Sequence, residues 1–290
     1  MKKILIIFSL FILMISCNIG KRELDISKKE ERDGIIYIIN EKKPFTGKIT
    51  AKYEDGKMKS EENFKEGKYD GAVKEYFSNG QLAFEGMFKD GELNGEAKIY
   101  FDNGQIENES SYINNKIEGI CKIYYEDGKL RNVINFKDDK RNGPSEYYYP
   151  NGQLQYLENY VDDILQGEGK IYYDNGILKE ENNYLDGKYH GLVKAYYPTG
   201  KLESEYNYKN GKAHGESKIY YENGKIKNIV NFVEDKINGV SKIYYDNGQL
   251  EGEYTFVDNQ FDGLFRKYSR DGKVTNEAIF KQGKVEKIIK

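Results

Sequence analysis

The 290-residue sequence contains no tryptophan, only two histidines, two cysteines and four prolines. Two cysteines are too few for a scaffold stapled by disulfides. Neither charge sign predominates, because 45 Lys and Arg stand against 48 Asp and Glu, for a formal net charge of −3. This balance argues against nucleic-acid binding, which needs a basic excess or stripe. The 27 tyrosines and 14 phenylalanines exclude a typical disordered polar chain, which is poor in aromatic residues.

The longest apolar run lies at the start of the chain. Lys2 and Lys3 precede the apolar segment 4–15, which Ser16 and Cys17 follow. A run of this length is too short to span a bilayer, which takes roughly 20 residues, and it is typical of an export signal. The small residue before Cys17 resembles a bacterial lipoprotein signal, which implies cleavage before Cys17 and a lipid on its thiol. A plain secretory signal with a chance cysteine is the alternative.

The next segment, residues 17–33, is rich in charge and poor in apolar residues. We therefore expect it to be a flexible tether behind the signal peptide 1–16. Residues 34–46 are interpreted as a half-repeat that caps one edge of a repeat array.

A 24-residue period organises the chain from residue 47 to residue 286. Two series of glycines define it, and ten copies run without insertion or deletion. The first series is Gly47, Gly71, Gly95, Gly119, Gly143, Gly167, Gly191, Gly215, Gly239 and Gly263. The second is Gly56, Gly80, Gly104, Gly128, Gly152, Gly176, Gly200, Gly224, Gly248 and Gly272. Positions within a repeat are counted from the first glycine as zero.

Two turns per repeat are expected. Asp or Asn precedes the second glycine in nine copies, as in Asn79-Gly80, and such pairs predict a two-residue type I′ turn at positions 8 and 9. Positions 19 and 20, as in Asp90-Gly91, supply the second turn. The sequence therefore predicts an all-β fold, an elongated antiparallel meander of about ten tandem β-hairpins. About 20 strands at 4.8 Å each would span roughly 100 Å. The Lys-rich end, residues 287–290 included, is expected to discourage edge-to-edge growth.

A turn at positions 8 and 9 makes position n face position 17 − n. Position 3 then opposes position 14, which pairs Lys with Glu or Arg with Glu in six copies: Lys74 with Glu85, Lys98 with Glu109, Lys170 with Glu181, Lys194 with Glu205, Lys242 with Glu253, and Arg266 with Glu277. We call the side that bears these pairs the Lys–Glu face; the tyrosines of position 5 share it. Positions 4, 6, 11 and 17 form the other side, the aromatic face, where position-17 rings are expected to lie across the zero-position glycines. An apolar face of this size should curl, bind a partner or form a homodimer.

The repeats resemble the bacterial variant of the MORN repeat. The closest matches are the segments 88–95 (FKDGELNG) and 208–215 (YKNGKAHG), and the resemblance covers about residues 34–286. It extends to lipoproteins and exported proteins grouped with the YwqK-type antitoxins. It implies a stacked β-hairpin rod for protein or membrane contact, with no established catalytic residues to carry over. We expect no metal and no cofactor. The eukaryotic repeat has a tryptophan before the turn, which this chain lacks.

Few residues suggest chemistry. His190 and His214 share position 23 in adjacent repeats, about 10 Å apart, too far to share one metal ion, and are interpreted as turn-flanking residues. The position-14 glutamates are interpreted as partners of lysine, and Cys121 as a small packing residue. The position-5 tyrosines are candidate partner-binding residues if their rings are exposed, and strand propensity alone is the other explanation. The candidates are Tyr124, Tyr148, Tyr172, Tyr196, Tyr220 and Tyr244.

The leading hypothesis is a non-enzymatic, lipid-anchored scaffold on the cell envelope that binds an unidentified protein. A second hypothesis is a binder of cell-wall or surface glycan, against which the lack of tryptophan counts. A third is an antitoxin or immunity protein that neutralises a toxin by direct binding, which only the family resemblance suggests. No nucleic-acid partner is expected.

Overall fold

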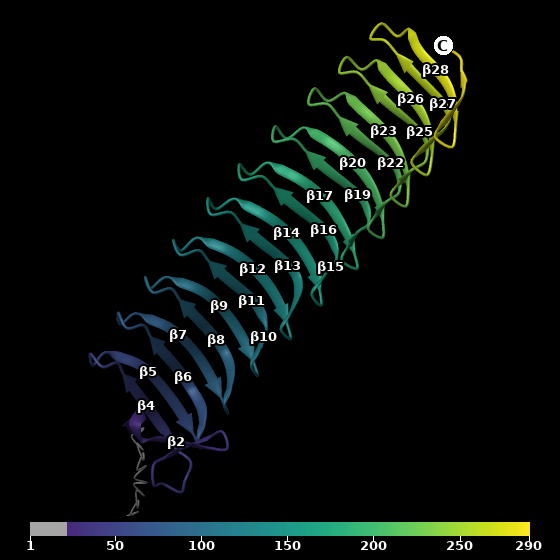
Figure 1. The fold of residues 1–290 in the computed structure, drawn as a ribbon. Helices are drawn as coiled ribbons and strands as arrows, with labels where there is room; N and C mark the ends of the chain where they lie inside the picture. Colours follow the sequence, from purple (N-terminus) through teal and green to yellow (C-terminus); the bar gives the residue numbers. More distant parts are fainter. Residues whose placement is uncertain (1–21) are drawn as a thin grey trace, which may run out of the picture.

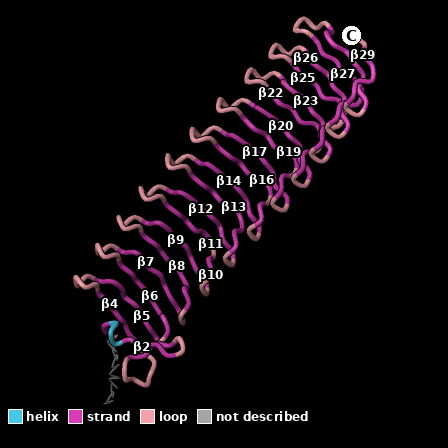
Figure 2. Tube along the Cα trace, viewed as in Figure 1, coloured by secondary structure: helices cyan, strands magenta, loops and turns pink. Residues whose placement is uncertain are grey.

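A computed structural model describes residues 22–290 of the chain. These residues form one 27-stranded sheet and a small two-stranded sheet. The hairpins stack one after another into a long, single-layered array of arched strands (Figure 1). Strands fill most of the trace and turns line its two long edges (Figure 2). The predicted all-β meander of tandem hairpins is confirmed.

The chain runs through the strands in order. The N-terminal part comprises β1 (Glu23–Asp25), the 3-10 helix η1 (Ile26–Lys28), β2 (Lys29–Arg32) and β3 (Ile35–Ile38). The first three repeats hold β4 (Gly47–Lys52), β5 (Met58–Lys65), β6 (Lys68–Tyr76), β7 (Leu82–Lys89), β8 (Glu92–Tyr100) and β9 (Ile106–Ile113). The next part holds β10 (Lys116–Ile117), β11 (Gly119–Tyr124), β12 (Leu130–Lys137), β13 (Lys140–Tyr148), β14 (Leu154–Val161), β15 (Ile164–Leu165), β16 (Gly167–Tyr172) and β17 (Leu178–Leu185). The last part holds β18 (Lys188–Tyr189), β19 (Gly191–Tyr196), β20 (Leu202–Lys209), β21 (Lys212–Ala213), β22 (Gly215–Tyr220), β23 (Ile226–Val233), β24 (Lys236–Ile237), β25 (Gly239–Tyr244), β26 (Leu250–Val257), β27 (Gln260–Tyr268), β28 (Val274–Lys281) and β29 (Lys284–Ile288).

The predicted pairing register holds from position 0 to position 4. In the second repeat Gly71 opposes Phe88 and Lys74 opposes Glu85, with an irregularity before Tyr76. The other hairpins repeat this register. Beyond position 4 the pairing of position n with position 17 − n no longer holds. Positions 6 and 11 therefore cannot be assigned to the aromatic face by counting alternate residues along the strands.

The type of the first turn was predicted wrongly. The Gly80 amide donates to the Phe77 carbonyl (2.8 Å), and the Phe77 amide donates to the Gln81 carbonyl (2.8 Å). Gly80 has φ +92°, whereas Asn79 is not among the positive-φ residues of the part described. This is a three-residue loop, a type I turn followed by a glycine bulge. The Asn79 side chain favours it by accepting from the Gln81 amide (2.9 Å). The two-residue type I′ turns lie at positions 19 and 20, as at Asn114 (φ 50°) and Asn115 (φ 66°).

The zero-position glycines form bulges, which the sequence did not predict. Phe64 of β5 pairs with Tyr69 of β6, and Glu62 pairs with Val73. Between these two pairs β6 therefore has two residues more than β5. Gly71 has φ +107° there, and a Cβ on it would meet the Cβ of Asn63 at 3.4 Å. Every zero-position glycine has positive φ. The backbone conformation by itself favours glycine at this position, and the packing of a position-17 ring across these glycines stays a prediction. The bulge divides five strands in two, and these five additional segments together with β1 and β29 bring the sheet from the 20 expected strands to 27.

An N-terminal cap, residues 22–46, covers the first hairpin. β1 pairs in parallel with β4, and β2 pairs with β3. The Ile36 amide donates to the Gly67 carbonyl (2.9 Å), which joins β3 to the turn of the first repeat. A cluster of buried apolar residues lies beneath: Ile36, Ile38, Phe45, Ile49 and Phe64, with Leu24 packed against it.

The cap includes residues 22–33, which were expected within the flexible tether. That expectation is wrong for this segment. Leu24 contributes an apolar contact, and Lys29 forms an ion pair with Glu62 at 2.8 Å. The charged residues therefore take part in the packing of the cap.

Candidate functional site

The position-3 and position-14 side chains of the Lys–Glu face form a column, the Lys–Glu column, that runs the length of the array. All six predicted pairs are direct cross-strand neighbours. Nζ to carboxylate distances are 3.7 Å for Lys74–Glu85, 4.0 Å for Lys170–Glu181 and 3.6 Å for Lys242–Glu253. Most of these side chains are about a third exposed or more, so each pair contributes roughly 0–1 kcal/mol. The column mainly fixes the register.

The position-5 tyrosines lie on the same face and use their hydroxyls within it. The Tyr124 hydroxyl donates to Glu109 of the preceding repeat at 2.8 Å. Tyr196 and Tyr220 do the same with Glu181 (2.9 Å) and Glu205 (2.8 Å). Burial, and then this hydrogen bond, raise the pKa of the Tyr124 hydroxyl to about 12. These rings are half-buried members of a network.

Three of the six candidate tyrosines differ from that pattern. Tyr148 donates to Glu146 in its own strand at 2.5 Å. In the repeats before those of Tyr172 and Tyr244, position 14 is Leu157 and Ile229, where other repeats have glutamate. Their hydroxyls have no hydrogen-bond partner among residues 22–290.

Exposed aliphatic side chains form a stripe that the sequence reasoning missed. They occupy positions 1, 16, 18 and 21, which share the parity of the Lys–Glu face on the half of the sheet nearer the type I′ turns. This aliphatic stripe comprises Met87, Ile113, Ile120, Val161, Ile164, Leu185, Leu192, Val233, Val240 and Val257, each 38–54% exposed. The large exposed apolar surface expected on the aromatic face is thus mostly on the opposite face.

Rings on the aromatic face cover one another instead. Phe64 stacks on Tyr69 with centroids 4.6 Å apart, and Phe256 lies 4.6 Å from Phe261. The small residues of position 2 lie buried among such groups, Ser145 at 0% exposure and Cys121 at 3%. Position 22, which the sequence reasoning did not single out, supplies the second ring in three repeats, where Tyr69, Tyr189 and Phe261 lie against the position-17 ring.

A signal for the aliphatic stripe exists in the sequence but alternates between two positions. Where position 1 is Glu, position 18 is aliphatic, as in Glu96 with Ile113 and Glu168 with Leu185. Where position 1 is a larger aliphatic residue, position 18 is often Lys, as in Ile120 with Lys137. No single position is aliphatic throughout, so a search position by position does not detect it.

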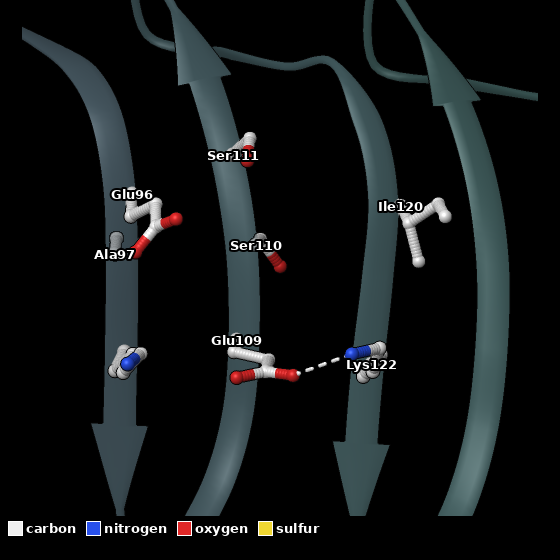
Figure 3. A pocket seen from close by; sticks show the side chains of 8 residues that line it. Glu96, Ala97, Glu109, Ser110, Ser111, Ile120 and Lys122 are labelled. Atoms are coloured by element: carbon white, nitrogen blue, oxygen red, sulfur yellow. Dashed lines mark hydrogen bonds and ion pairs between the residues drawn. The ribbon is translucent and has the colours of Figure 1, made fainter.

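Equivalent hollows open beside the stripe in several repeats, and two of them are larger than the others. The first, about 320 Å³, lies across β8, β9 and β11 and is lined by Glu96, Glu109 and Ile120 among others. Figure 3 shows Glu109 on β9 paired with Lys122 on β11 (3.0 Å), and Ile120 on β11, the same strand as Lys122. The second, about 350 Å³, is lined by the corresponding residues three repeats later, Glu168, Glu181 and Leu192 among them. The two smaller ones are about 210 and 200 Å³, lined by Glu85 and Glu96 and by Glu205 and Glu216 among others.

The histidine position, 23, has the turn-flanking role that the sequence predicts. The His190 amide donates to the Asn183 carbonyl at 2.8 Å beside a turn. Elsewhere at position 23, Glu118 accepts from the Asp138 amide (2.9 Å), which is the turn-flanking role. Within residues 22–290 no group of three His, Cys, Asp or Glu side chains is placed to hold a metal ion. No helix of that range has the length and apolar character to cross a membrane. Cys17, the predicted lipidation site, lies outside the described residues.

Comparisons with known proteins agree with this geometry. The MORN repeat variant matches nine segments: 45–66, 69–90, 93–114, 117–138, 141–162, 165–186, 189–210, 213–234 and 237–258. Each segment runs from position 22 of one repeat to position 19 of the next, so it contains the first turn of the repeat and its position-17 ring. The tenth repeat, with β27 and β28, keeps the same pairing although it is not matched. No curated protein matches the sequence.

Solved structures give a weaker likeness. The crystal structures of TcdB2-TccC3 and of TcdB2-TccC3-Cdc42 are 11% and 12% identical to this chain, each with a TM-score of 0.20. The matches cover 78% of this chain but only 15% and 14% of those chains. At such values they carry no argument about fold or function. The repeat match spans more than half of the sequence, and the chain belongs to the family of the MORN repeat variant.

Proposed function

We propose that this protein is a non-enzymatic scaffold of the cell envelope that binds another protein along its Lys–Glu face and is held to the membrane by a lipid on Cys17. The aliphatic stripe is the observation that carries the proposal. Ten exposed aliphatic side chains follow one face of the array, with charged side chains beside them. Apolar surface of this extent beside a polar margin is typical of protein-interaction sites.

The same surface favours a protein partner over a glycan. Sugar rings stack on exposed aromatic rings, whereas the exposed residues of this face are aliphatic and its tyrosines are half-buried. A toxin neutralised by direct binding would be one particular kind of protein partner, so the antitoxin hypothesis is a special case of this proposal.

The anchor is inferred from the sequence. Cys17 lies five residues before Arg22, and the cap lies at the N-terminal end of the array (Figure 1). A lipid on Cys17 would hold that end at the membrane surface and let the hairpins extend from it. Labelling with radioactive palmitate tests this proposal. The wild-type chain should take up label and sediment with membranes, and Cys17→Ser should do neither. Equal labelling of both chains would refute the anchor.

Site-specific photo-crosslinking tests the binding face. The full-length chain would carry a photoreactive residue at Leu192 on the aliphatic stripe or, as a matched control, at Ile99 on the aromatic face, since both are 43% exposed. In the native envelope we expect a discrete protein crosslinked from position 192 and none from position 99.

The other outcomes of that experiment are equally informative. A protein crosslinked only from position 99 would contradict the proposed face, and a second copy of this chain there would favour the homodimer through the aromatic face. A carbohydrate adduct from position 192 would favour the glycan alternative. No adduct from either position would overturn the scaffold proposal.

A further inference from the structure

We propose that the segment bound along the aliphatic stripe is a proline-rich, basic stretch of polypeptide in the polyproline II conformation, running along the array and across its strands. The inference rests on the proposed function and names the chemistry of the partner. Three observations carry it: the spacing of the hairpins, the equivalence of the two larger hollows, and the charges that remain unpaired within them.

The spacing selects the conformation of the ligand. Equivalent residues of successive repeats are two strands apart, about 9.4–9.8 Å. A polyproline II helix presents the same side every three residues, about 9.3 Å. An α-helix repeats approximately every seven residues, about 10.5 Å, and a β-strand every two, about 6.6 Å. Only the first period keeps a ligand in phase with several repeats of this array.

The hollows supply two matching contacts. Ile120 and Leu192, 52% and 43% exposed, occupy the same place in the first and second hollow. They are three repeats apart, about 28–29 Å from the strand spacing. Nine residues of polyproline II span about 28 Å. A pyrrolidine ring every third residue would therefore meet the stripe repeatedly, as proline-rich segments meet apolar grooves in other domains.

Charge complementarity sets the rest of the chemistry. Glu96 in the first hollow and Glu168 in the second form no ion pair within residues 22–290, whereas Glu109 is paired with Lys122 at 3.0 Å. A Lys or Arg of the ligand at each hollow, the two lying about nine residues apart, would pair with these free carboxylates.

The lysines of the hollows complement the ligand backbone. A polyproline II segment has no internal hydrogen bonds, so its carbonyls are free to accept. Lys98 lines the first hollow and Lys194 the second, at different places, because Lys194 corresponds to Lys122 of the first hollow; neither forms an ion pair or hydrogen bond within residues 22–290. Their ammonium groups are therefore available as donors to the ligand carbonyls.

Synthetic peptides provide the probe. Two polyproline peptides of equal length would each carry two lysines, nine residues apart in one and eight apart in the other. The composition is identical, but eight residues turn the second lysine to another side of a three-residue helix. By isothermal titration with the full-length chain in detergent, we expect the nine-residue spacing to bind up to about fivefold tighter, which is what one additional exposed ion pair supplies.

Variants of the protein distinguish the effect of the carboxylates in the hollows from the effect of the overall negative charge. The double variant Glu96→Gln/Glu168→Gln should abolish the preference for the nine-residue spacing. Glu203→Gln/Glu251→Gln removes the same charge from position 12, away from both hollows, and should keep the preference. Equal affinity for the two peptides, no binding of either, or an unchanged preference in Glu96→Gln/Glu168→Gln would overturn the proposal.

This result is distinguishable from a failure of the proposed function. If a protein is crosslinked from position 192 but neither peptide binds, the scaffold stands and the polyproline ligand is wrong. If purified cell-wall glycan binds and Glu96→Gln/Glu168→Gln leaves that binding unchanged while no peptide binds, both proposals fall.

Discussion

The Tyr125 hydroxyl donates a 2.7 Å hydrogen bond to the backbone carbonyl of Tyr148, the position-5 residue of the next repeat. Pairing between neighbouring hairpins stops at position 4, as at Ile123↔Asn108, so the position-5 carbonyl lies beyond the ladder. Seven repeats make this bond, from Tyr53, Tyr125, Tyr149, Tyr173, Tyr197, Tyr221 and Tyr245. The position-6 ring, expected only to pack, thus joins successive hairpins.

Removing one such hydroxyl should weaken the array locally. Tyr125→Phe leaves the ring in place and the Tyr148 carbonyl without this donor, which should lower the free energy of unfolding by about 0.5–1.5 kcal/mol. Urea denaturation followed by circular dichroism measures the change.

The chain offers the reverse change as a control. Phe77 occupies position 6 in the second repeat, so the Tyr100 carbonyl receives no such bond. Phe77→Tyr should supply the bond and raise stability by a similar amount. Unchanged stability in both variants would show that these hydrogen bonds contribute nothing.

The zero-position glycines should resist substitution because of their backbone conformation. Gly119 has φ +86°, and a Cβ there would meet no atom within 4 Å. The cost of a substitution therefore comes from the backbone conformation and not from a steric clash. Gly119→Ala should cost about 1–2 kcal/mol of unfolding free energy. Gly119→Asn should cost less, because asparagine visits the left-handed region more readily. A fully stable Gly119→Ala variant, judged by its thermal midpoint, would be at odds with this explanation.

The cap should depend on a shielded ion pair. The Lys29 ammonium lies 2.8 Å from Glu62 and 5.2 Å from the ring centroid of Phe64. The two charged side chains are only 20% and 12% exposed, and the pKa of Lys29 is raised because the pairing with Glu62 outweighs the effect of burial. Lys29→Ala should therefore destabilise the cap by roughly 2–3 kcal/mol, less than the 3–5 of a fully buried pair.

Hydrogen exchange at the Ile36 amide, which bonds the Gly67 carbonyl, reports on the cap. It should accelerate in Lys29→Ala and stay slow in Lys29→Met/Glu62→Leu, where no charge is left unpaired. Equal exchange in all three chains would mean that the pair does not hold the cap.

Stability should fall at alkaline pH. Burial and hydrogen bonds to glutamate raise the pKa of Tyr76, Tyr100 and Tyr124 to about 12. In the unfolded chain a tyrosine titrates near its ordinary value of about 10. Between these two values the folded state binds more protons than the unfolded state, so unfolding becomes easier as pH rises. The tyrosine contribution is complete below pH 10 and is lost as pH approaches 12.

Urea midpoints measured from pH 8 to pH 12 test the effect. The midpoint should decrease above pH 10, and Tyr100→Phe should lessen the slope. A midpoint that is constant to pH 12 would contradict the role assigned to these hydroxyls.

The sequence by itself determined the repeat, the register and the fold class. Both glycine series recur every 24 residues, and the pairing of Lys74 with Glu85 follows from them by subtraction. In a meander each strand pairs with its sequence neighbours, so local signals fix the architecture without knowledge of distant contacts. The tyrosines of position 5 were placed on the correct face for the same reason.

The tertiary structure decided what those signals leave open. The turn at Asn79-Gly80 and the bulge at Gly71 depend on backbone dihedrals that several glycine motifs satisfy equally well. Each bulge adds two residues to one strand and shifts its pairing with the preceding strand by two residues, a change that no residue pattern predicts. The cap appears only when Leu24 and Lys29 meet Phe64 and Glu62 from the first repeat. The aliphatic stripe emerges only when positions 1 and 18 of adjacent strands are brought side by side, because exposure is a property of neighbours and not of a residue type.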